Sequence, residues 1–215
     1  MSRLINTLIA SVLVAAPVAA FAQFSMPSLP GMGAKSAAGA DLSGAQDQLV
    51  RQYVDANKTV MLANAHMADA MGLKDDAAKL RASSESLGDG ATKGNLADAD
   101  KATSDTNRKL TEKLNDKTVV LDADAKKKYT AGLVTMASGV VKYVGMKSSF
   151  QSFASNLKTA SPMMLPKLQS GVYIVSSLPT NAKNLTAALS SATEFAKSHD
   201  IQVPPEATSA MGASF

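Results

Sequence analysis

Residues 122–158 read DADAKKKYTAGLVTMASGVVKYVGMKSSFQSFASNLK, the stretch with the broadest apolar face in the chain. Its apolar side chains recur at steps of three and four residues, which is the spacing of one face of an α-helix. They are Tyr129, Leu133, Met136, Val140, Tyr143, Val144, Phe150, Phe153 and Leu157. Small residues, among them Gly132 and Gly139, recur beside this face at seven-residue steps. The pattern predicts one long helix over 122–158, with the other helices packed around it.

Helical periodicity continues on both sides of this stretch. The first helix is predicted over 41–71, where two adjacent apolar rows make the wide stripe typical of a bundle helix. Alanines recur on it at seven-residue steps, at Ala56, Ala63 and Ala70, and are expected to pack against the glycines of 122–158. Further helices are predicted over 75–87, 95–114, 163–177 and 180–199, the last two separated by Pro179. The predicted fold is all-α, a single bundle of about five to six helices over residues 41–201.

The N-terminal residues have the pattern of a secretory signal peptide. Arg3 precedes an apolar run over 4–16, and Ala20-Phe21-Ala22 matches the small-x-small cleavage pattern, so residues 1–22 are predicted to be removed after Ala22. The apolar run is short for a membrane span, and no stable membrane insertion is expected after cleavage. These features predict a periplasmic protein of a Gram-negative bacterium. Residues 23–40 are predicted to be a flexible leader and residues 202–215 a disordered tail, because both are rich in small residues and proline.

Composition excludes several classes of function. The chain has no cysteine, which excludes disulfides, thiol catalysis and thiolate metal sites. It has no tryptophan and only 5% aromatic residues, which argues against platforms that stack on nucleic-acid bases, and no nucleic-acid partner is predicted. The net charge of +4 is a weak bias that permits contact with an anionic surface without requiring it.

No catalytic constellation is evident. His66 is followed by Asp69 three residues on, a spacing that can orient an imidazole, but no nucleophile pattern accompanies the pair. His199 suits the C-terminal end of the last helix, where a cation is favoured by the helix dipole. The carboxylates of the third helix, Asp98, Asp100 and Asp105, define no catalytic pair. The chain is therefore predicted not to be an enzyme, with no catalytic residues and no cofactor.

Methionine suggests one metal hypothesis. Thioethers select Cu(I), and His66-Met67 with Met71 one turn on could gather ligands at one helix edge. Most methionines lie on the apolar stripes, however, where methionine commonly fills irregular gaps in a core. No metal site is predicted, and copper binding is kept as an alternative function.

The remaining hypotheses concern binding. The chain is predicted to be a non-catalytic binding, scaffold or assembly protein of the cell envelope, with another envelope protein as its partner. The alternative is a periplasmic carrier of an apolar ligand or lipid. In that case the face of 122–158 would line a cavity, and Tyr143, Phe150 and Phe153 are the predicted ligand-binding residues.

Overall fold

The computed structural model describes residues 34–213 and 215, with side chains from Asp41 onward. The predicted signal peptide and residues 23–33 lie outside the described residues. The described part of the chain is helical, with no strand over residues 34–213, which confirms the predicted all-α class. Its elements are α1 (Ala34–Ala70), α2 (Lys74–Ser86), α3 (Lys93–Asn115), α4 (Ala123–Gly145), α5 (Lys147–Leu157), the 3₁₀ turn η1 (Leu165–Lys167), α6 (Gln169–Ser198) and α7 (Pro205–Met211). None of the described helices is long and apolar enough to cross a membrane.

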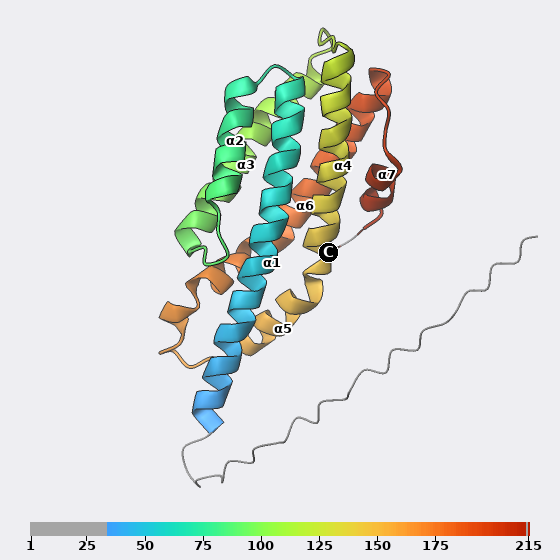
Figure 1. Ribbon diagram of the computed structural model, residues 1–215. Helices are drawn as coiled ribbons and strands as arrows, with labels where there is room; N and C mark the ends of the chain where they lie inside the picture. Colours follow the sequence, from blue (N-terminus) through green and yellow to red (C-terminus); the bar gives the residue numbers. More distant parts are fainter. Residues whose placement is uncertain (1–33, 214) are drawn as a thin grey trace, which may run out of the picture. The chain divides into compact units, whose positions relative to one another are not determined.

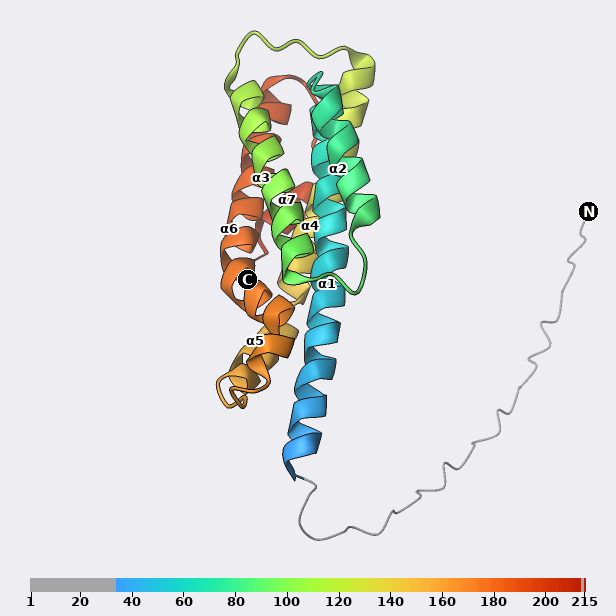
Figure 2. The same cartoon turned by 90° about the vertical axis from the view of Figure 1, so that its left-hand side faces the viewer.

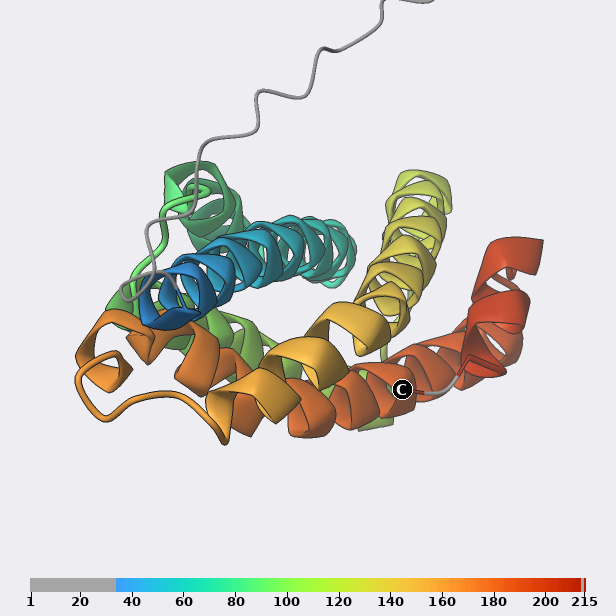
Figure 3. The same cartoon turned by 90° about the horizontal axis from the view of Figure 1, so that it is seen from below.

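The helix at the centre of the bundle is α1, and not the predicted helix over 122–158. It contacts α2, α3, α4, α5 and α6, and Figures 1 and 3 show these helices placed around it. Its core-facing side chains are buried on both of the apolar rows that the sequence predicts, including Leu49, Tyr53 and Met61. Helix α1 therefore organises the core, and α3 and α6 lie side by side next to it (Figure 2).

The closest pairing of helices in the bundle is between α1 and α4, and it depends on glycine. A Cβ at Gly132 would lie 2.6 Å from the Cγ of Met67 and 3.2 Å from the backbone oxygen of Ala63. A Cβ at Gly139 would lie 2.8 Å from a methyl group of Val60. The predicted pairing of α4 glycines with small residues of α1 is thus confirmed at Ala63, whereas Gly139 faces Val60.

Replacing Gly139 by leucine is expected to destabilise the protein by roughly 1–3 kcal/mol, because the new side chain overpacks the contact with α1. The nearest atom is the end of the Val60 side chain, which can shift, so the fold should survive. Chemical denaturation measures the change in the free energy of unfolding. An unchanged midpoint would contradict the close approach of the two helices.

The predicted helix over 122–158 is two helices. Helix α4 ends at Gly145, and α5 begins at Lys147 after Met146. The backbone N–H of Met146 bonds to the carbonyl oxygens of Tyr143 and Val144, which tightens the last turn, and Gly145 has a low helix propensity. Periodicity alone does not show this break. It allows α5 to turn Phe153 inward against α1 and α6.

Two predicted helices over 163–177 and 180–199 are one helix, α6, with Pro179 inside it. Proline removes one backbone hydrogen bond, yet the helix continues because its buried face continues across the proline. That face contains Ile174, Leu178, Ala182 and Leu185, at steps of four, four and three residues. Pro179 itself is exposed, so its ring interrupts no core contact.

Both ends of the predicted bundle differ from the structure. Helix α1 begins at Ala34, seven residues before the predicted start of the first helix at residue 41. The prediction of a disordered tail is wrong, because residues 205–211 form α7, which packs against α4 and α6. Pro205 occupies the first turn, where proline is tolerated, and Ala207 and Ala210 are buried one turn apart. The small residues that resembled a flexible tail are those that allow this short helix to pack closely.

Candidate functional site

A polar network joins α1, α3 and α6 inside the bundle. One oxygen of Asp100, Oδ2, accepts hydrogen bonds from the hydroxyls of Tyr53 and Tyr173, both at 2.6 Å, and from Nδ2 of Asn181 at 2.9 Å. Tyr53 is fully buried. Burial raises the pKa of Tyr53 and of Tyr173 above the usual value, and the neighbouring charge of Asp100 raises both further. Both phenols therefore remain protonated donors at neutral pH.

The same network spans Pro179 on α6. Tyr173 and Ser177 precede the proline, and Asn181 follows it. Ser177 Oγ lies 3.3 Å from the Tyr53 hydroxyl, and Asn181 Nδ2 lies 2.7 Å from it. Tyr53 contacts the segments of α6 on both sides of Pro179. The network therefore holds these two segments in line at the position where the proline removes a backbone hydrogen bond.

A small polar cavity, which we call the chamber, lies beside this network. Its volume is about 50 Å³, and its lining includes Asn57 of α1, Asp100 and Thr103 of α3, and Tyr143 of α4. Three buried polar atoms of this lining have no hydrogen-bond partner among the described residues: Nδ2 of Asn57, Oδ1 of Asp100 and Oγ1 of Thr103. Asn57 is 1% exposed and Thr103 is 9% exposed. Buried polar atoms are nearly always paired, so three of them around one cavity indicate a place for a polar group.

A larger cleft opens between α3 and α6 and shares three lining residues with the chamber. Its volume is about 360 Å³, and its floor includes the buried side chains of Met67, Tyr129 and Met136. Its walls come from α3 and α6: Ser104, Asn107, Arg108, Leu110, Thr111, Leu114, Asn184, Ala187, Ala188, Ser191 and Ala192. Ser104, Asn107 and Asn184 line the cleft and the chamber alike, so the polar chamber lies directly beside the cleft.

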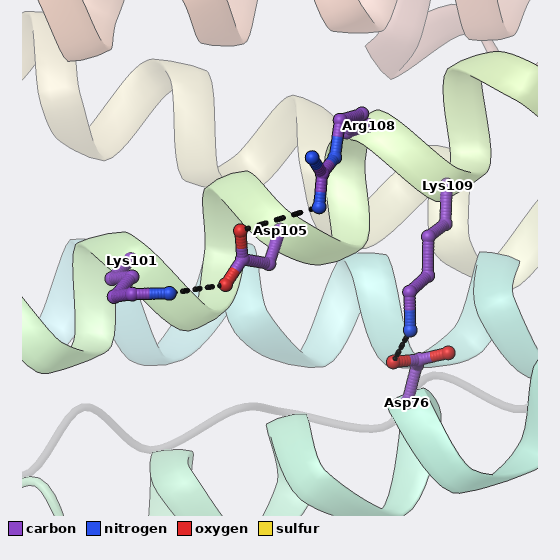
Figure 4. A network of polar contacts seen from close by, with 5 residues as sticks. All are labelled: Asp76, Lys101, Asp105, Arg108 and Lys109. Carbon is purple, nitrogen blue, oxygen red and sulfur yellow. Dashed lines mark hydrogen bonds and ion pairs between the residues drawn. The ribbon is translucent and has the colours of Figure 1, made fainter.

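One charged residue of α3, Arg108, lines the cleft, whereas Lys101, Asp105 and Lys109 line a groove between α2 and α3. Figure 4 shows Lys101 and Arg108 reaching Asp105 from either side, with distances of 2.7 and 3.7 Å. Lys109 pairs with Asp76 of α2 at 2.6 Å and so ties the two helices together. Arg108 lines the cleft, but its side chain is 70% exposed, which makes it a rim residue and not part of the floor.

The predicted ligand-binding residues are not gathered around one cavity. Tyr143 lines the chamber, and its hydroxyl donates a 2.9 Å hydrogen bond to Oδ1 of Asn57. Phe150 packs edge-on against Phe215, with ring centroids 5.2 Å apart. Phe153 is 0% exposed and lies against Gly171, so it is a core residue. A second, shallower groove of about 560 Å³ between α4 and α6 is lined by Tyr143 and Phe215.

The other candidate side chains have structural roles. Asp69 bonds to Arg81 of α2 at 3.1 Å and lies 3.8 Å from Lys128 of α4. The arginine hydrogen bond lowers the pKa of Asp69. His199 ends α6 and stacks on Phe195, with centroids 3.8 Å apart. Asp69 thus links three helices, in place of the pair with His66 that its spacing suggests.

The methionines considered as copper ligands lie mainly in the core. Buried thioethers, including Met67 on the cleft floor, are Met61, Met67, Met71, Met136 and Met146. Met163 is 85% exposed. Over the described residues, no cluster of three or more histidine, aspartate or glutamate side chains has the arrangement of a metal site.

Sequence reasoning missed the chamber, although one signal for it exists. Asn57 falls within the apolar stripe of α1, and an uncharged amide in such a stripe is a buried polar group that needs a partner. Thr103 likewise falls on the buried side of α3 by its helical spacing. The sequence does not show that either residue lies near Asp100.

Comparison of the chain with protein-family models, with curated proteins and with solved structures found no match.

Proposed function

We propose that this chain is a non-catalytic binding protein whose cleft between α3 and α6 takes a small molecule with an apolar body and a polar end. The observation that carries the proposal is the position of the cleft beside the chamber, whose lining residues include three with buried polar atoms that lack partners among the described residues. The cleft volume of about 360 Å³ falls in the range of small-molecule sites. The proposal also includes export, since residues 1–22 have the signal-peptide pattern, and a role in the periplasm.

A ligand role is supported by the rigid base of the cleft. Met67, Tyr129 and Met136 lie beneath it and are at most 3% exposed, so the base consists of packed core side chains. Tyr129 is held in place by a 2.9 Å hydrogen bond to the carbonyl oxygen of Ala192 and by contact with Phe195. The floor is thus formed before a ligand arrives, which reduces the entropy lost on binding.

Filling the cleft tests this proposal. Ala188 is half-buried in the cleft wall, and Ala188→Phe would place a ring in the space of the ligand. We expect the affinity for the fluorescent apolar probe N-phenylnaphthylamine to fall by about tenfold or more, because the ring and the probe exclude each other. Fluorescence titration of the folded protein measures this change.

The matched control is Ala131→Phe, which adds the same ring on the exposed face of α4. It should leave probe affinity unchanged. The proposal fails if the wild-type protein does not bind the probe, or if both variants bind it as the wild type does. If the proposal holds, native mass spectrometry of protein purified from its own compartment would identify the bound molecule.

A further inference from the structure

We infer that the polar end of the ligand is a primary ammonium group, which Asp100 binds in the chamber beside the cleft. The inference rests on the proposed function and names its ligand class. It depends on three features of the chamber: its charge, its free hydrogen-bonding atoms and its size.

The chamber holds a negative charge that no cationic side chain balances. Among the ion pairs of the described residues, none includes Asp100. The nearby cations of α3 are engaged elsewhere, since Lys101 and Arg108 face Asp105 and Lys109 pairs with Asp76 (Figure 4). A carboxylate taken from water without a counter-charge is costly, so a cationic ligand would be favoured there.

The unpaired oxygen atoms of the chamber residues are suited to accept hydrogen bonds from a ligand. Oδ2 of Asp100 already accepts three hydrogen bonds, whereas Oδ1 of this chamber-lining residue has no partner among the described residues. Oγ1 of Thr103 is a second acceptor without a partner. An ammonium group presents three N–H donors and can bond to both oxygens at once. Hydrogen bonds between two ionised groups are about twice as strong as neutral ones.

The size of the chamber selects a small head group. A buried water needs about 10–15 Å³ of cavity volume. The chamber volume of about 50 Å³ is therefore sufficient for an ammonium group together with a few waters. Nδ2 of Asn57 would donate to one of these waters. A trimethylammonium group lacks N–H donors and would leave Oδ1 of Asp100 and Oγ1 of Thr103 unpaired.

A competing orientation places an anionic group at Arg108 on the rim. That side chain is 70% exposed and already shares Asp105 with Lys101. A charge pair in this position is screened by solvent and contributes little. The buried chamber is therefore the stronger site for the polar end.

The experiment measures displacement of N-phenylnaphthylamine by decylamine, decanol, decanoate and decyltrimethylammonium, each below its micelle concentration at neutral pH. We expect decylammonium to bind at least about tenfold more tightly than decanol, the factor for one charge-assisted hydrogen bond. Asp100→Asn should reduce this preference to within about twofold. The control Asp98→Asn removes an exposed carboxylate of the same helix and should leave the preference intact.

Three results would overturn the inference: equal binding of decylammonium and decanol, tightest binding of decanoate, or a preference that survives in Asp100→Asn. If Asp100→Asn does not fold, the wild-type protein still decides, because decyltrimethylammonium must bind at least about tenfold more weakly than decylammonium. In each of these cases probe binding and its loss in Ala188→Phe still support the cleft. If the probe does not bind, the proposed function itself fails.

Discussion

Replacing Gly132 by leucine is expected to destabilise the protein by more than about 3 kcal/mol, beyond the usual cost of overpacking. A Cβ at this position meets the Cγ of Met67 at 2.6 Å, the carbonyl oxygen of Ala63 at 3.2 Å and the backbone nitrogen of Met67 at 3.3 Å. A side-chain end can shift, but the backbone of α1 cannot move without disturbing its contacts with the other helices. Thermal and denaturant unfolding of the variant measure the loss.

The matched control is Gly145→Ala, near the other end of α4. A Cβ there meets nothing within 4 Å, and alanine is the better helix former, so stability should be unchanged or rise by up to about 1 kcal/mol. If Gly132→Leu were as stable as this control, α1 and α4 would not approach each other as closely as the structure shows.

Truncating Phe153 to alanine is expected to cost about 3–5 kcal/mol, the range for removing a buried aromatic ring. The ring is 0% exposed and lies where a Cβ at Gly171 would be, so it fills the junction of α1, α5 and α6. This stability change distinguishes a core role of Phe153 from the role predicted from the sequence, in which Phe153 lines a ligand cavity. A cavity-lining ring would be largely exposed in the free protein, and its removal would change stability little.

Phe150→Ala provides the comparison, because Phe150 lies three residues before Phe153 on the same helix and is only partly buried, against Phe215. Its loss should cost clearly less than the loss of Phe153. If both substitutions had equal and small effects on the free energy of unfolding, the α5–α6 junction would be open. Both residues would then again be candidates for ligand binding.

Much of the fold could be predicted, because periodicity reports directly which side of a helix is buried. The bounds of α2 and α3 and the end of α1 are predicted to within two residues. The errors lie where a local signal was outweighed by packing. Pro179 suggested a boundary that the buried face from Ile174 to Leu185 overrides, and the small residues after 202 suggested disorder where Ala207 packs against its neighbours.

The site could not be predicted in the same way. Its members are brought together by the crossing of helices: Tyr53 lies 47 residues from Asp100 and 128 residues from Asn181. Periodicity places each of these side chains on a face but does not tell which faces meet. The aromatic residues of 122–158 looked like the walls of a cavity because they are large and apolar, and those are also the properties of a side chain that fills a core.

The central position of α1 has a consequence for the order of folding. Helix α1 packs against partners that come much later in the chain, since α4 begins at Ala123 and α6 at Gln169. Contacts between residues far apart in the chain form slowly, and these require most of the polypeptide to be synthesised. We therefore expect the bundle to be completed only after translation. A chain whose bundle is completed so late is well suited to crossing a membrane as an extended polypeptide, as the proposed export requires.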